Sequence, residues 1–157
     1  MSFMSAQPLK PDANGTPDRN KAGSLYERLG GGECLARVHR RLYDKIFDHP
    51  EFRAFFADKN RDHQETQQTD FMASKFGGPA VYRGRLPDGA HQHMYITDAH
   101  FELRQGLLAE TLDECGVDPE LRDQWLAIDR SFKNAIVKSS LSECRKRYNT
   151  DTIIVAP

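Results

Sequence analysis

Hydrophobic residues recur three and four positions apart over much of this chain, which is the period of an amphipathic α-helix. The pattern is clearest where Leu35, Val38, Leu42 and Ile46 fall on one helical face. Pro50 should end this helix, because a proline disfavours helical backbone in the residue before it. A short turn rich in phenylalanine is predicted next, with Phe52, Phe55 and Phe56.

The same patterns predict four further helices. The first begins at Ser24, where Ser24 and Glu27 have the spacing of a capping box, and the run Gly30-Gly31-Gly32 should end it. The others are predicted over about residues 62–76, 97–115 and 119–140. No segment alternates apolar and polar residues as a strand would. The predicted fold class is therefore all-α, with glycine-rich corners where the helices change direction.

The two ends of the chain differ from its helical middle. Residues 1–22 contain three prolines and few large apolar residues, and they are predicted to form a disordered N-terminal tail. Residues 23–147 are predicted to form one folded domain, and residues 148–157 a C-terminal tail. The apolar run Ile153-Ile154-Val155 in that tail is expected either to fray or to dock on the domain. A chain of 157 residues suits a single domain.

Composition and charge exclude several classes of function. A formal net charge of -1 gives no electrostatic basis for binding nucleic acid or an anionic membrane. No apolar run approaches the length of a membrane span, and the N-terminus lacks the apolar core of a signal peptide. Cys34, Cys115 and Cys144 are far apart in sequence, which argues against a disulfide framework and against a thiolate zinc site. These features predict a cytoplasmic protein.

The leading candidate for chemistry is His91, which lies on a short segment between two predicted helices, after a loop through Tyr82 and Gly84. Imidazole binds iron, copper or zinc at neutral pH, and a short segment between helices can present one ligand to a flat cofactor. His93 could take its place. His63, His91 and His93 could also hold zinc together, although no cysteine or carboxylate ligand motif accompanies them. On context alone, a histidine is more often structural or exposed than a metal ligand.

The predicted helix at residues 62–76 has an unusual face, because Gln64, Gln67, Gln68 and Phe71 share it. A polar stripe that merges into an apolar one indicates a face that looks into a mixed environment. The plainer interpretation of the glutamines is a solvated helix face. Tyr43 likewise has a plain interpretation, in which its ring joins the core and its hydroxyl reaches solvent.

Taken in order along the chain, these features resemble the truncated haemoglobins, and specifically their group I. The resemblance covers about residues 24–137, and it implies a globin-like, truncated two-over-two helical sandwich around a haem. No single piece of it is decisive. The residues that carry it are Ser24-Leu25-Tyr26-Glu27-Arg28-Leu29-Gly30-Gly31, Tyr43, Pro50, Phe55-Phe56, Phe71, Gly77-Gly78-Pro79, Tyr82, Gly84, His91, Ile96-Thr97 and His100-Phe101.

The resemblance implies roles for particular residues around haem b. His91 would be the proximal ligand of the iron, with Phe56 stacked on the porphyrin and Phe71 packed on the distal side. Arg104 would face the cofactor too, and nothing in the sequence explains a charged side chain there. The other residues that the resemblance assigns to cofactor binding are Gln67, Tyr82, Arg85, Ile96 and Phe101, with Arg85 as a partner for a propionate.

The same resemblance assigns the distal pocket to Tyr43, Gln64 and Gln68. Their hydroxyl and amide groups would donate hydrogen bonds to a ligand, each contributing on the order of 1 to 3 kcal/mol, so dioxygen should leave slowly. Gln67 stands where some relatives have a histidine that binds the iron, which implies an open or water-bound sixth position. No histidine follows His100, so a covalent haem link from the last helix is not available.

The function that the resemblance implies is reversible binding of dioxygen, and also of nitric oxide and carbon monoxide. If the protein is an enzyme, the implied reaction is nitric oxide dioxygenation, which needs an unidentified electron-donating reductase. A haem-based sensor or a peroxidase-like protein is an alternative, although peroxidases usually need a distal acid-base pair. A cofactor-free helical interaction module is another, and it would be colourless.

Overall fold

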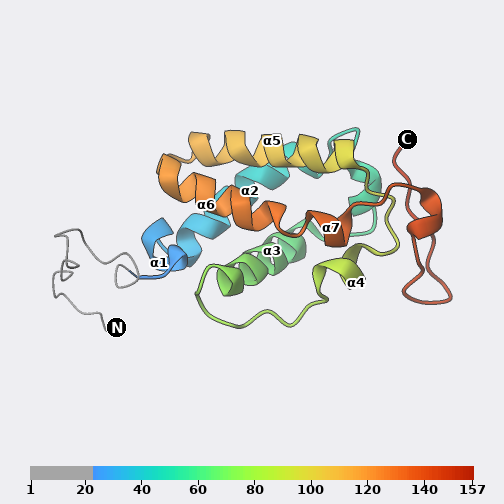
Figure 1. The fold of residues 1–157 in the computed structure, drawn as a ribbon, viewed down its shortest axis with the longest axis horizontal. Coiled ribbons are helices and arrows are strands. Elements are labelled where there is room, and N and C mark those ends of the chain that lie inside the picture. The colour runs from blue at the N-terminus through green and yellow to red at the C-terminus, as the bar shows by residue number, and fades with distance from the viewer. Residues whose placement is uncertain (1–22) are drawn as a thin grey trace.

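The computed structural model describes residues 23–157, and the predicted tail at residues 1–22 lies outside them. The prediction of an all-α fold is confirmed, since the β-pairing in the described residues consists of one isolated bridge, between Met94 and Ile154. Arg53–Phe56 and Leu141–Glu143 form 3₁₀-helices. The α-helices are α1 (Leu25–Leu29), α2 (Gly32–Ile46), α3 (Arg61–Lys75), α4 (Pro87–His91), α5 (Asp98–Glu114), α6 (Pro119–Arg130) and α7 (Lys133–Ile136) (Figure 1).

The helices α1 and α2 follow the sequence pattern closely. The Ser24 hydroxyl accepts a hydrogen bond from the Glu27 backbone N–H at 3.2 Å, and the Glu27 carboxylate accepts one from the Ser24 N–H, as in a capping box. Gly30 ends α1 with a φ of 104°, which strongly favours glycine. The predicted inner face of α2 is confirmed, because its apolar members are buried: Leu35, Val38, Leu42 and Ile46.

The corner after α3 brings two backbones close together. The Tyr26 N–H donates a hydrogen bond to the Phe76 carbonyl at 2.9 Å, which ties α1 to the end of α3. A Cβ atom at Gly78 would lie 2.5 Å from the Tyr26 ring, so a side chain at position 78 would force the two segments apart. The glycine corner predicted from the sequence therefore also anchors α1.

The prediction of one last helix is wrong, because the chain forms two helices there and the second ends at Ile136. The Ser131 N–H is shared between the Ala127 and Ile128 carbonyls, both at 3.1 Å, and the Phe132 N–H donates to the Asp129 carbonyl. The two bonds that reach back three residues, from Ser131 to Ile128 and from Phe132 to Asp129, tighten the backbone and interrupt the α-helical pattern. After the break, the Phe132 ring packs on that of Phe71, with 5.2 Å between their centroids.

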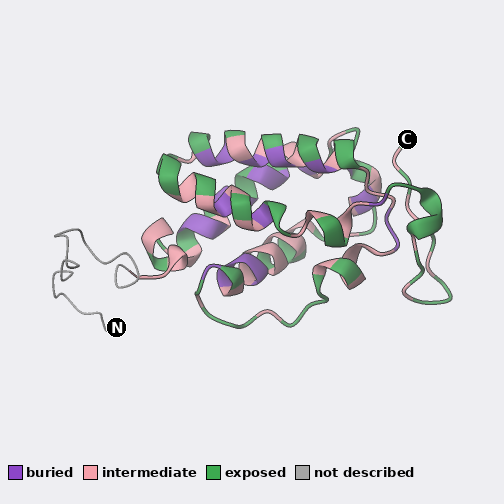
Figure 2. Ribbon diagram, in the orientation of Figure 1, coloured by how far each residue is buried: buried purple, intermediate pink, exposed green. Residues whose placement is uncertain are grey.

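The long helices form two packed pairs. α2 packs against α3, α5 packs against α6, and α2 also contacts α5, which matches the predicted two-over-two sandwich (Figure 1). Buried positions gather where the helices face one another, and the outer side of α5 is exposed (Figure 2). None of the helices in residues 23–157 has both the length and the apolar character that crossing a membrane requires.

The segment around His91 has more regular secondary structure than the sequence pattern predicts. His91 is the last residue of α4, a one-turn helix that begins with Pro87, and α4 packs against α7. Proline suits the first helical position, because its ring fixes the backbone φ angle near the helical value. The C-terminal run docks beside this segment, because Ile154 exchanges backbone hydrogen bonds with His93 and Tyr95, each at 2.8 Å.

Candidate functional site

The interior of the described domain contains a cavity of about 420 Å³, within the size range of small-molecule and cofactor sites. Side chains from the helical sandwich, the loop before α4 and the C-terminal segment surround it. All eleven residues that the resemblance assigns to the haem or to the distal pocket line this cavity, although their predicted roles are a separate matter. They are Tyr43, Phe56, Gln64, Gln67, Gln68, Phe71, Tyr82, Arg85, His91, Ile96 and Phe101.

His91 has one ring nitrogen engaged and one free. Its Nδ1 lies 2.7 Å from the Pro87 carbonyl oxygen and must carry the proton, because a carbonyl can only accept. That tautomer leaves Nε2 as a lone-pair donor in a side chain that lines the cavity. Burial lowers the pKa of His91 to about 4, so its imidazole is neutral at pH 7. A neutral imidazole fixed by a backbone acceptor has the form in which histidine binds metals.

His93 has different surroundings, although it is only two residues away. Its side chain is 2% exposed, it is not part of the cavity lining, and neither ring nitrogen has a hydrogen-bond partner among the described residues. In residues 23–157, no three histidine, cysteine or acidic side chains lie close enough to share a metal ion. The alternative zinc site of His63, His91 and His93 is therefore not formed.

The polar part of the cavity wall comes from α2 and α3. Tyr43 is buried, and its hydroxyl forms no hydrogen bond with any described residue. Burial raises the pKa of this phenol to about 12, so it stays protonated and able to donate. Gln64 and Gln68 lie one turn apart on α3 and line the same cavity, as does Gln67. Gln67 lies where the loop approaches α3, since its Oε1 would be 2.7 Å from a Cβ atom at Gly84.

Aromatic rings form much of the remaining wall. Phe56 stacks on Phe47 with 5.1 Å between ring centroids, and Tyr43 lies 5.8 Å from Phe56. Phe71 contacts Tyr82 edge to face at 5.1 Å. The phenylalanine cluster seen in the sequence thus borders a cavity as well as packing the core. A flat apolar molecule would fit against such rings.

Basic side chains lie around the cavity, and the sequence pattern found only some of them. Arg85 is exposed, and its guanidinium contacts Tyr148 by a hydrogen bond and by lying over the ring, 5.1 Å from the centroid. Lys59 and Arg147 also line the cavity, and neither was predicted. Arg147 is held by Asp151 at 2.9 and 3.0 Å. No sequence signal indicates Arg147, because it lies far from the motifs, in the C-terminal segment.

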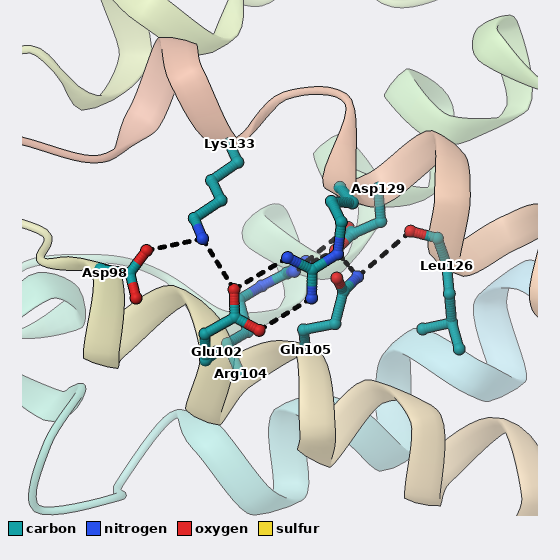
Figure 3. A network of polar contacts seen from close by, with 8 residues as sticks. Asp98, Glu102, Arg104, Gln105, Leu126, Asp129 and Lys133 are labelled. Atoms are coloured by element: carbon teal, nitrogen blue, oxygen red, sulfur yellow. Dashed lines mark hydrogen bonds and ion pairs between the residues drawn. The ribbon is translucent and has the colours of Figure 1, made fainter.

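Arg104 has a partner that the sequence analysis did not identify. Its Nη1 lies 3.1 and 2.9 Å from the two carboxylate oxygens of Asp129, on α6 (Figure 3). Both residues line the cavity, and Asp129 is buried. A partly buried cation and a buried anion that pair in this way relieve each other's desolvation. The charge at position 104 is thus explained structurally, although the two residues are 25 positions apart in sequence.

A comparison with family models identifies this chain between residues 24 and 138 as a bacterial-like globin. A group 1 truncated haemoglobin from Tetrahymena pyriformis is 33% identical over 120 residues, covering 76% of this chain and 99% of that protein. Another, from Mycolicibacterium paratuberculosis, is 35% identical over 97 residues, covering 62% of this chain and 71% of that protein.

Solved structures show the same relation. The ferric form of the truncated haemoglobin from Tetrahymena pyriformis superposes with a TM-score of 0.69 at 29% identity, over 74% of this chain and 100% of that one. A two-over-two haemoglobin from a Synechococcus species, in its cyanomet state with covalently attached haem, has a TM-score of 0.68 at 30% identity. It covers 73% of this chain and 98% of that one.

Proposed function

The chain belongs to the bacterial-like globin family, as a group 1 truncated haemoglobin, and we propose that it holds haem b through His91 and binds dioxygen. Membership of this family implies a haem and a gaseous ligand. We propose three further points, which are the identity of the iron ligand, the type of haem and the reaction. The observation that carries the proposal is the His91 imidazole, which is fixed through Nδ1 and free at Nε2 beside the cavity.

The residues around the cavity fit a haem in chemistry as well as in size. Haem has an apolar, flat ring system and two anionic propionates. The aromatic wall would contact the ring, and the basic side chains of Lys59, Arg85 and Arg147 could pair with the propionates. The sequence has no histidine after His100, which favours a haem held without a covalent link from the last helix. Haem b is a haem without a covalent link to the protein, so this feature supports the assignment of haem b.

Tyr43, Gln64 and Gln68 are proposed to bind the gaseous ligand. When bound, haem supplies an iron position at which a diatomic molecule can coordinate. The Tyr43 hydroxyl and the two amides would donate hydrogen bonds to such a ligand, since no other described group occupies them. Crystal structures exist of three single variants of the Tetrahymena pyriformis protein, one with a tyrosine replaced and two with a glutamine replaced. The three positions are separated along that chain as Tyr43, Gln64 and Gln68 are separated along this one.

Strong hydrogen bonds from Tyr43 and the glutamines would slow the release of dioxygen. Slow release is better suited to a protein in which bound dioxygen reacts than to one that delivers dioxygen elsewhere. The proposed reaction combines nitric oxide with dioxygen and one electron to give nitrate. A separate reductase would supply the electron. The residues contribute by holding dioxygen in place with Tyr43 and the glutamines and by excluding water with the aromatic wall.

The first experiment is an absorption spectrum of the purified protein in ferric, dithionite-reduced and carbon-monoxide-bound forms, compared with His91→Ala and His93→Ala. We expect a Soret band that shifts on reduction and again on adding carbon monoxide. In His91→Ala, this pattern should be lost or altered, because the substitution removes the imidazole with which α4 lines the cavity. His93→Ala is the matched control and should keep the wild-type spectrum.

Two outcomes would contradict the proposal in different ways. A normal spectrum in His91→Ala with an altered one in His93→Ala would move the iron ligand to His93. A protein without a Soret band, even after reconstitution with haem, would exclude haem binding and leave the cofactor-free interaction module as the interpretation.

A further inference from the structure

Arg104 points a charged group into the cavity from α5, and Asp129 holds that group in position. Asp129 accepts hydrogen bonds from Arg104 and from Gln105, the latter at 2.9 Å (Figure 3). Because two donors from α5 converge on one carboxylate of α6, the Asp129 side chain has a fixed orientation. The guanidinium that pairs with it is fixed in turn.

Among residues 23–157, only one of the three Arg104 nitrogens has a hydrogen-bond partner. Both contacts with Asp129 come from Nη1, and neither Nε nor Nη2 bonds to any described residue. The Arg104 side chain keeps 25% of its surface exposed and lines the cavity, whereas Asp129 keeps only 5%. Because Arg104 lines the cavity and these two nitrogens bond to no described residue, their N–H groups are available to donate to a guest there.

A neighbouring ion pair shows what a purely structural link between α5 and α6 looks like. Arg130 on α6 uses Nη1 and Nη2 on the two carboxylate oxygens of Glu102, both at 2.8 Å. That pair lies outside the cavity lining and leaves Arg130 half-exposed at the surface. Arg104 differs from Arg130, because it lines the cavity and its Nε and Nη2 bond to no described residue.

Arg104 and Tyr43 both line the cavity, from two helices that contact each other. α5 packs against α2, which carries Tyr43, whereas α4 with His91 packs against α7. The Arg104 charge opposes the rise in the pKa of Tyr43 that burial causes, and it adds to the lowering of the pKa of His91, so both groups lie within its electrostatic reach. Tyr43 and Arg104 thus both have hydrogen-bond donors that can reach a guest in this cavity.

We propose that Arg104 is a binding residue for small monovalent anions that enter the cavity beside Tyr43, with Asp129 as its positioning residue. A full positive charge gives an inorganic anion a charge-assisted hydrogen bond, which is stronger than the hydrogen bond that it gives a neutral ligand. Among the described lining residues, Arg104 is the basic side chain that the proposed propionate contacts leave over, because those contacts use Lys59, Arg85 and Arg147. The inference rests on the proposed function, because the anion would share its space with the haem ligand.

The test compares anionic with neutral ligands of the ferric, haem-loaded protein. Azide and nitrite are the anions and imidazole is the neutral ligand, and each Kd is read from the shift of the Soret band. The variant Arg104→Met/Asp129→Leu removes both charges, so that no carboxylate is left buried without a partner. Arg130→Met is the matched control, since it removes a guanidinium between the same two helices outside the cavity.

We expect the Kd for azide and nitrite to rise about tenfold or more in the double variant, as for the loss of a charged hydrogen bond. Imidazole affinity should change less than about threefold, and Arg130→Met should resemble the wild type. Unchanged azide affinity in the folded double variant would overturn the proposal. An equal loss for azide and imidazole would do so too, because it would indicate only a distorted cavity.

A second measurement needs no haem. In the apoprotein, the ¹⁵N resonance of Arg104 Nε is followed while sodium azide is added, with Arg130 Nε as the internal reference. A saturable shift confined to Arg104 supports the anion site, and the absence of any shift contradicts it. If the protein proves unable to bind haem, this experiment still tests the anion site separately from the proposed function.

Discussion

Tyr43 is the residue on which ligand retention should depend most. Its phenol is buried, protonated at neutral pH and free of hydrogen bonds to described residues. Replacing it with phenylalanine in Tyr43→Phe keeps the ring contact with Phe56 and removes only the donor. We expect the dioxygen dissociation rate to rise about tenfold or more, as for the loss of one strong hydrogen bond. Stopped-flow mixing of the oxygenated protein with carbon monoxide measures this rate.

Tyr82→Phe is the matched control for that prediction. Tyr82 also lines the cavity, but its hydroxyl already donates to the Arg85 carbonyl. Its removal should change the dissociation rate less than about threefold. If Tyr43→Phe and Tyr82→Phe behave alike, the Tyr43 hydroxyl does not hold the ligand.

His39 should make the fold sensitive to acid. It is 1% exposed on α2, its Nδ1 lies 2.8 Å from the Thr69 hydroxyl, and its ring packs on Trp125. Burial, with a smaller contribution from Arg104, lowers its pKa from 6.5 to about 3. The folded state therefore binds a proton less readily than the unfolded state. The stability that neutral His39 confers is complete above pH 6.5 and is lost as the pH falls toward 3.

At pH 5 this loss amounts to about 2 kcal/mol relative to pH 7. His39→Gln has no titrating group and can still bond to Thr69, so it should lose about 2 kcal/mol less than the wild type over the same interval. Urea unfolding of both haem-loaded proteins at pH 7 and pH 5 measures the difference. An identical loss in both would show that His39 does not titrate on unfolding.

At the scale of elements, the C-terminal segment should help to retain the cofactor. It lies beyond residue 138, where the family match ends, and it pairs with the backbone just after α4. Its Arg147 lines the cavity. Deleting residues 144–157 should therefore speed haem loss, by about tenfold if one charged contact and the backbone pairing are both lost. Transfer of haem to an excess of an acceptor protein gives the rate.

Two point variants separate the causes of that effect. Arg147→Gln removes the charge and leaves the segment docked, whereas Ile154→Pro removes the N–H that donates to the His93 carbonyl. If the deletion changes the rate and neither point variant does, other contacts of the segment are responsible. A deletion variant that loses haem at the wild-type rate would contradict the prediction.

At the scale of the whole molecule, the helical sandwich brings distant polar residues together around one space. Tyr43, Gln64 and His91 come from three different helices and meet only at the cavity. The order of their motifs along the chain allowed the family to be identified. A resemblance of this kind assigns residues to a site, but it says nothing about partners that lie outside the motifs.

Those partners were the part of the site that sequence patterns missed. Asp129 pairs with Arg104 across two helices, and Arg147 reaches the cavity from the C-terminal segment. Neither contact has a fixed spacing or a period that could reveal it. The break between α6 and α7 was missed for a related reason, because Ser131 and Phe132 have no strong helix-breaking character and the hydrogen-bond shift there depends on packing against α3.

The sequence by itself determined the helical class, most helix starts and the inner face of α2, because these depend on local periodicity and capping. It also identified which residues would gather at a site. Only the tertiary structure decided that His91 ends a one-turn helix with Nδ1 bound to Pro87, that His93 lies outside the cavity lining, and that Arg104 pairs with Asp129 beside the cavity. The physical reason is that hydrogen-bond partners and burial are set by residues distant in sequence.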